Sequence, residues 1–159
     1  MNPPEKTQET LVVRRVLPAP AEVVYRAWTD PAMITRWSWG PHHDTLSATI
    51  DCRVGGAWHH EIRNRNNGEE WTFDGRFEEV IHNQRLVHTF HWKSGGGVEE
   101  GTSLVAIDFV PKGPEATEVI ITHSRLAAAS REGTREGWQD ILEQIGQLVA
   151  SGPRMVPQS

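Results

Sequence analysis

The patterned part of the chain begins with one strand and two short helices. Residues 10–17 are rich in β-forming side chains, and two prolines follow them directly. Apolar residues recur at helical spacing over residues 21–28. Asp30 precedes a proline and is suited to cap a second short helix. We expect that helix to carry Trp37 and to end at a turn over residues 39–41.

Between residues 46 and 124 apolar and polar positions alternate with a period of two, which is typical of strands that bury one face. Six such segments follow one another through short turns, among them Gly55-Gly56 and the strong hairpin signal Asn66-Asn67-Gly68. The pattern therefore predicts an antiparallel meander. Its buried face is expected to carry Ile50, Trp58, Phe73, Phe90, Ile107 and Ile121.

The last patterned segment is a long amphipathic helix. Apolar residues from Trp138 to Val149 repeat at i, i+3, i+4 and i+7, and Gly152-Pro153 follows as a stop signal. A sheet with one apolar face needs a cover, and this helix is the only predicted element long enough to supply it. The chain thus has an α+β pattern, with one domain expected over residues 10–150 and flexible tails at 1–9 and 151–159.

Composition narrows the classes of partner. The net charge is −5, from 16 basic and 21 acidic residues, and no basic cluster is apparent. Such a chain is a poor candidate for binding nucleic acid or an anionic membrane. The single cysteine, Cys52, suits a reducing compartment. Without a visible signal peptide or a membrane-spanning apolar run, the sequence predicts a cytoplasmic protein.

Motifs for catalysis and cofactors are not apparent in the sequence. We find no nucleophile elbow, phosphate-binding loop or dinucleotide fingerprint, so we assign no catalytic residue and expect no cofactor. Strand parity places Asp51 and Arg53 outward, which favours a surface ion pair over a general base. Cys52 is expected to point inward as an inert buried thiol.

Three histidines, His60, His88 and His123, fall on the inward face of the third, fifth and seventh strands. Neighbours in this set would lie two strands, roughly 9.6 Å, apart. That spacing disfavours one metal held by all three, so we predict no metal site. They are expected to be buried rings with hydrogen-bond partners, and an acid–base cluster is the alternative.

Aromatic residues share this inward surface and would form either a packed core or the wall of a cavity. The candidate ligand-binding residues are Trp58, His60, Trp71, Phe73, His88, Phe90, Trp92, His123, Trp138 and Leu142.

Several stretches resemble a known family. They are Val-Tyr-Arg-Ala-Trp-Thr-Asp-Pro at 24–31, Arg-Trp-Ser-Trp-Gly-Pro at 36–41, Asp-Cys-Arg-Val-Gly-Gly-Ala-Trp at 51–58, Arg-Leu-Val-His-Thr-Phe at 85–90 and Gly-Trp at 137–138. Over about residues 11–150 the chain is similar to the START-like (SRPBCC) superfamily, in the branch of homologues of the activator of heat-shock protein 90 ATPase. The resemblance implies a helix-grip fold, in which a seven-stranded antiparallel sheet curls around the C-terminal helix. It also implies a cavity between them that often holds apolar ligands.

The expected function is the binding of a small apolar or amphipathic molecule in that cavity. One alternative is a lyase or cyclase similar to the polyketide cyclases, for which the three histidines would be the acid–base candidates. A second alternative is an interaction module that modulates a chaperone through its outer surface. The oligomeric state, a homodimer included, stays open.

Overall fold

The computed structural model describes residues 8–37, 42–94 and 102–150. The chain begins with strand β1 (Gln8–Leu17) and the two short helices α1 (Ala21–Thr29) and α2 (Pro31–Ile34). Six strands follow: β2 (His43–Ile50), β3 (Ala57–Asn64), β4 (Glu70–Ile81), β5 (Arg85–Ser94), β6 (Thr102–Pro111) and β7 (Thr117–Ala127). A short 3-10 turn, η2 (Ala128–Ser130), leads into the long helix α3 (Arg131–Val149).

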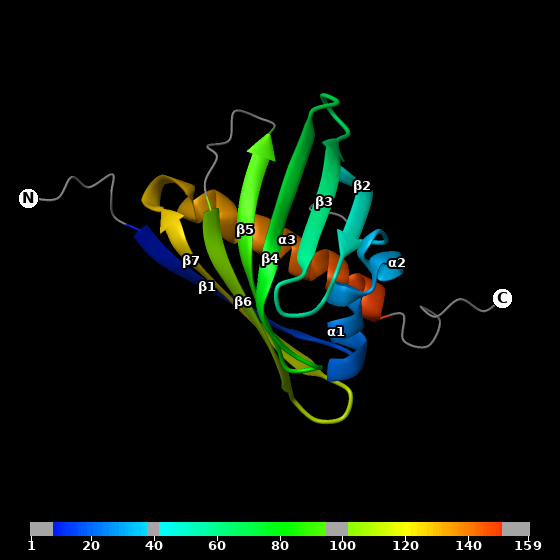
Figure 1. Ribbon diagram of the computed structural model, residues 1–159. Helices are drawn as coiled ribbons and strands as arrows, with labels where there is room; N and C mark the ends of the chain where they lie inside the picture. Colours follow the sequence, from blue (N-terminus) through cyan, green and yellow to red (C-terminus); the bar gives the residue numbers. More distant parts are fainter. Residues whose placement is uncertain (1–7, 38–41, 95–101, 151–159) are drawn as a thin grey trace, which may run out of the picture.

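The strands form one seven-stranded sheet in the order β1-β7-β6-β5-β4-β3-β2, and every neighbouring pair is antiparallel. The predicted meander and helix-grip architecture are therefore confirmed. Helix α3 lies across one face of the curved sheet, and α1 and α2 gather near its C-terminal end (Figure 1). Strands β1 and β2 form the two edges of the sheet.

The expected alternation of buried and exposed residues is present in the sheet. Five of the six residues predicted for the inner face are almost completely buried: Trp58, Phe73, Phe90, Ile107 and Ile121. The sixth, Ile50, is half-buried against the same core. Because side chains alternate between faces along a strand, these positions fix the register of the whole sheet.

Local signals in the sequence also correspond to observed contacts. The Asp30 carboxylate accepts a hydrogen bond from the Ala32 amide at 3.0 Å and caps α2 as predicted. At the hairpin between β3 and β4, Gly68 adopts a φ of 76°, which glycine tolerates best. The expected surface pair is confirmed, since the Arg53 Nε donates to both Asp51 oxygens at 2.9 Å.

Two local predictions were wrong, and both concern where an element ends. Helix α2 ends at Ile34, so Trp37 lies beyond it, held by a hydrogen bond from its indole to the Ala27 carbonyl (2.8 Å). Strand β2 ends at Ile50, so Cys52 lies just beyond it; its thiol packs against the core as expected but is only half-buried, 3.8 Å from the Tyr25 hydroxyl. Alternation along a strand gives no prediction of burial once the strand has ended.

Some predictions fall on residues outside the described part of the chain. These are the turn over residues 39–41, the loop that begins at Ser94 and continues to 97, and most of both tails. Within the described ranges, no helix combines the length and apolar character that crossing a membrane requires.

Leu142 provides a test of the packing between α3 and the sheet. Its side chain is 1% exposed, so Leu142→Ala should lower the free energy of unfolding by about 2–5 kcal/mol. The exposed Gln147 on the same helix is the control, and Gln147→Ala should change that free energy by less than about 0.5 kcal/mol. Urea titrations of both variants measure the difference, and equal midpoints would contradict the packing.

Candidate functional site

A small cavity lies between the sheet and α3, with a volume of about 40 Å³. Its walls come from α1, the segment after α2, four strands and α3, so no single segment of sequence builds it. The lining residues are Trp28, Trp37, Ile50, Trp58, His60, Phe77, Leu86, His88, Phe90, Trp138 and Ile141. All but two of them are apolar or aromatic, and the two exceptions are histidines.

The two cavity histidines contact the same indole ring. The Trp58 ring centroid is 5.1 Å from that of His60 and 5.0 Å from that of His88, and both contacts are edge-on. Both histidines are buried, as the strand alternation predicted. Trp58 therefore contacts both histidines in the described lining of this cavity.

One backbone carbonyl, that of Thr89, orients two of these side chains. It accepts a hydrogen bond from the Trp58 indole at 3.2 Å and another from His88 Nδ1 at 2.8 Å. A carbonyl oxygen can only accept, so Nδ1 of His88 carries the proton. In the neutral ring Nε2 is then the hydrogen-bond acceptor.

The close approach of Trp58 to Thr89 requires a glycine at position 75. Gly75 pairs with Trp58 across β3 and β4, and the indole passes over it to reach β5. A Cβ atom at this position would lie 2.6 Å from Trp58 Nε1 and still closer to the Thr89 carbonyl oxygen. The glycine that interrupts the aromatic pattern of β4 is therefore what lets the indole cross the sheet.

His123 belongs to a hydrogen-bonded chain behind the cavity wall. The Trp138 indole donates to His123 Nδ1 at 2.9 Å. His123 Nε2 therefore carries the proton and donates to the Ser103 hydroxyl at 2.6 Å, and that hydroxyl donates to the Phe90 carbonyl at 3.4 Å. Both ring nitrogens are satisfied in the neutral state, so His123 positions Trp138.

Burial keeps all three inward histidines neutral near pH 7. It lowers the pKa of His60 to about 3, with smaller contributions from the charges of His88 and His59. It lowers the pKa of His88 to about 4, against the opposing effect of the hydrogen bond to Thr89. It lowers the pKa of His123 to about 3, with a smaller contribution from His88.

The indole N–H groups of three cavity tryptophans are bonded to protein acceptors. Trp37 donates to Ala27, Trp58 to Thr89 and Trp138 to His123. These rings can therefore offer the cavity only their apolar faces and edges. His60 and His88 add polar ring nitrogens to the described lining.

Five of the ten candidate residues line the cavity: Trp58, His60, His88, Phe90 and Trp138. Two others, Phe73 and His123, lie behind this lining and pack on Phe90, with ring centroids 5.4 Å away in both cases. They support the wall from outside.

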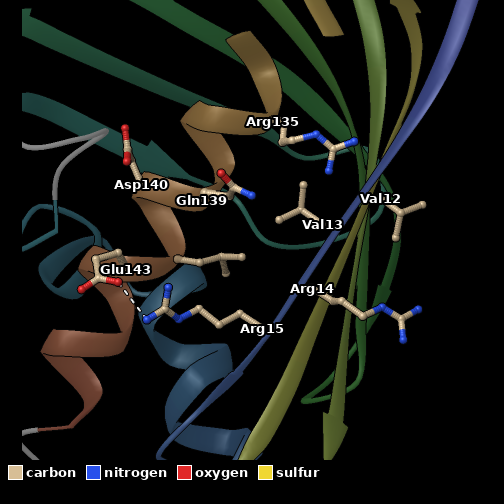
Figure 2. Close-up of a pocket in the computed structure, with 9 residues that line it drawn as sticks. Val12, Val13, Arg14, Arg15, Arg135, Gln139, Asp140 and Glu143 are labelled. Carbon is tan, nitrogen blue, oxygen red and sulfur yellow. Dashed lines mark ion pairs between the residues drawn. The ribbon is translucent and has the colours of Figure 1, made fainter. Parts of the chain in front are cut away.

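The remaining candidates lie elsewhere. Trp71 is half-buried beside His43, with ring centroids 5.5 Å apart, and its indole donates to Glu69 at 3.3 Å. Leu142 lines a separate groove between β1 and α3 (Figure 2). The side chain of Trp92, on β5, is outside the described part of the structure.

Six lining residues were not among the candidates: Trp28, Trp37, Ile50, Phe77, Leu86 and Ile141. Phe77 and Leu86 share the inward parity of their strands, so the period-two pattern contained the signal for them. Ile141 has the helical spacing of a core position. Trp28 comes from α1 and Trp37 from the segment after α2, and the period-two pattern of the strands contained no signal for either of them.

A metal site is not apparent in the structure. Across residues 8–37, 42–94 and 102–150, no three His, Cys, Asp or Glu side chains are arranged to hold a metal ion.

Comparison with known proteins places this architecture among solved structures. A protein from Chromobacterium violaceum is 28% identical, with a TM-score of 0.74, over 88% of this chain and 96% of that one. An AHSA1-like protein from Aeromonas hydrophila is 22% identical, with a TM-score of 0.75, over 95% and 99%. A protein from Rhizobium leguminosarum is 23% identical, with a TM-score of 0.76, over 91% and 96%. The last two likenesses concern the fold alone.

The comparison with curated protein sequences found no match. The family model for "Activator of Hsp90 ATPase homolog 1-like protein" matches residues 18–150, which include α1, α2, the meander and α3. Since this match spans most of the chain, the protein belongs to the family of activator of Hsp90 ATPase homolog 1-like proteins.

Proposed function

We propose that the protein binds a small apolar or amphipathic molecule in the cavity between the sheet and α3. The observation that carries the proposal is a buried, aromatic-walled cavity that contains two neutral histidines. Burying a polar ring costs free energy that an apolar side chain of similar size would not cost. Apolar walls with a few placed polar groups are typical of sites for small molecules.

The orientation of His88 suggests what the ligand offers. Its Nδ1 is committed to the Thr89 carbonyl, so the ring can accept one hydrogen bond at Nε2. A ligand with a single O–H or N–H group on an apolar body would match this acceptor. A carboxylate would not match it, because an ionised oxygen only accepts hydrogen bonds.

The size of the cavity adds a condition to the proposal. A volume of about 40 Å³ is well below the ~150 Å³ of an apolar cavity known to admit benzene. A ligand larger than a few water molecules must therefore displace wall side chains. Phe90 and Trp138, whose ring centroids are 6.3 Å apart, link the sheet to α3 at this wall and are the residues we expect to move.

The protonation of the histidines favours binding over catalysis. A general base works best with a pKa near the operating pH, and burial lowers the pKa of His60 to about 3 and that of His88 to about 4. The described lining contains no carboxylate that could raise these values. The cyclase alternative is correspondingly weaker.

Titration with N-phenyl-1-naphthylamine, an apolar probe with one N–H group, tests the proposal. The native protein should bind it saturably below high micromolar concentration and show quenched tryptophan emission, since Trp37, Trp58 and Trp138 border the cavity. Phe90→Leu should change the affinity. Val149→Ala is the control, because Val149 is completely buried near the end of α3 and lies outside the described cavity lining, so it should leave the affinity unchanged.

The converse result would reject the proposal. If the native protein binds no probe and only Phe90→Leu does, the space between sheet and helix is ordinary packed core. A change of equal size in Val149→Ala would likewise show that the probe is not in this cavity.

A further inference from the structure

The outer face of β1 has a distinctive pattern at an open edge of the sheet. Within the described residues β1 pairs with β7 alone, so the backbone groups on its other edge have no strand partner. Val12 and Val16 are 44% and 53% exposed, and Arg14 lies between them. Figure 2 shows Val12 and Arg14 on the side of β1 that faces away from α3. Alternation places Val16 on this same side.

The inner side of β1 faces a groove. The groove has a volume of about 740 Å³ and runs along the edge of β1, so residues 12–15 of that strand all border it. From α3 it is lined by Arg135, Gln139, Asp140, Leu142 and Glu143. Figure 2 shows Arg135 reaching from α3 toward β1, and the Arg15–Glu143 ion pair (2.8 Å) crossing between them. Beyond that pair the helix approaches the strand closely, since a Cβ atom on Gly146 would lie 3.3 Å from Leu17.

We propose that β1 is a docking site for an extended segment of another protein, which adds to the sheet as an eighth strand. An open strand edge offers the main-chain hydrogen bonds for this mode of recognition. On the outer face, alternate side chains of the added strand would be apolar, acidic and apolar. They would lie opposite Val12, Arg14 and Val16. Its intervening side chains would point into the polar groove, which has room for small polar residues.

Arg14 can accept an acidic partner without leaving another charge unpaired. It is 60% exposed and contacts Glu118 at 3.6 Å. Glu118 also contacts Lys112 at 3.5 Å, so it keeps a cation if Arg14 turns to a docked carboxylate. Charge complementarity therefore favours an added strand with an acidic residue opposite Arg14.

The same residue disfavours a second copy of this chain as the occupant. Two β1 edges related by a two-fold axis pair antiparallel. The register that sets Val12 against Val16 of the other copy also sets Arg14 against Arg14. Like charges directly opposite each other in a sheet are destabilising.

A fluorescein-labelled peptide, Ser-Thr-Val-Thr-Glu-Thr-Val-Thr-Ser, tests the proposal by fluorescence anisotropy. The native protein should bind it, and a peptide with lysine in place of glutamate should bind at least tenfold more weakly. Arg14→Glu should reverse this preference, and that rescue also demonstrates a folded variant. Arg63→Glu, an exposed arginine on β3, is the control and should leave the preference unchanged.

Backbone methylation distinguishes strand addition from attraction of charges alone. One peptide carries N-methyl groups on the valines and the glutamate, and the other on the threonines. An added strand uses one of its two edges, so one of these peptides should bind and the other should not. Equal binding by both, or by neither, would overturn the proposal. A concentration-dependent dimer in sedimentation experiments that Arg14→Glu abolishes would assign the edge to a second copy and overturn it as well.

Discussion

Lowering the pH from 7 to 5 is expected to reduce the free energy of unfolding by about 2 kcal/mol for each of the three buried histidines. The unfolded chain protonates these rings near pH 6.5, whereas the folded chain holds the pKa of His60 and His123 at about 3 and that of His88 at about 4. Between these limits the unfolded state binds more protons. The contribution of these histidines to the free energy of unfolding is therefore fully present above pH 6.5 and is lost as the pH falls.

Summed over the three histidines, the loss of unfolding free energy is comparable to the whole stability of a typical domain, about 5–15 kcal/mol. Partial burial lowers the pKa of His43 as well, which acts in the same direction. Urea unfolding followed by tryptophan fluorescence at pH 7, 6 and 5 measures the slope. We expect cooperative unfolding at pH 5 to require much less urea than at pH 7.

His88→Asn identifies the contribution of one ring. The asparagine amide can replace Nδ1 as donor to the Thr89 carbonyl, but it does not titrate. This variant should lose about a third of the pH dependence. Gln147→Asn, at an exposed position without a titratable group, should keep all of it. A native protein whose unfolding free energy is the same at pH 7 and pH 5 would show that these rings are not held neutral by burial.

Gly75→Ala is expected to destabilise the fold by at least about 3 kcal/mol. The added methyl group would overlap the Thr89 carbonyl and lie 2.6 Å from Trp58 Nε1, so the hydrogen bond between them must break. Overpacking costs about 1–3 kcal/mol, and a buried polar group left without a partner costs a similar amount.

A second glycine supplies the control for this effect. Gly137 lies in α3, and a Cβ atom there would meet nothing within 4 Å. Gly137→Ala should therefore stabilise the protein by up to about 1 kcal/mol, the usual gain inside a helix. Denaturant titrations compare the two variants, and Gly75→Ala should also shift the tryptophan emission because Trp58 moves. A Gly75→Ala protein as stable as the native one would refute the close packing of Trp58 across β4.

The alternation of residues by itself determined most of the fold. Apolar residues at every second position in six segments were compatible with only one set of inward side chains, because successive residues in a strand point to opposite faces. That pattern also placed His60, His88 and His123 on the buried face. The ends of the elements were less well determined. Trp37 and Cys52 were assigned to elements that stop before them, because residues outside helices and strands follow no regular hydrophobic spacing.

Only the tertiary structure decided which inward side chains line the cavity and how they are hydrogen-bonded. Periodicity says which face a side chain is on, but not how far it lies from a side chain on another layer. The cavity depends on such distances: Trp28 joins it from α1 and Trp37 from the segment after α2, while Leu142 lines the groove beside β1. Its small volume and the proton positions on His88 and His123 follow from three-dimensional packing and hydrogen bonds, neither of which a linear pattern encodes.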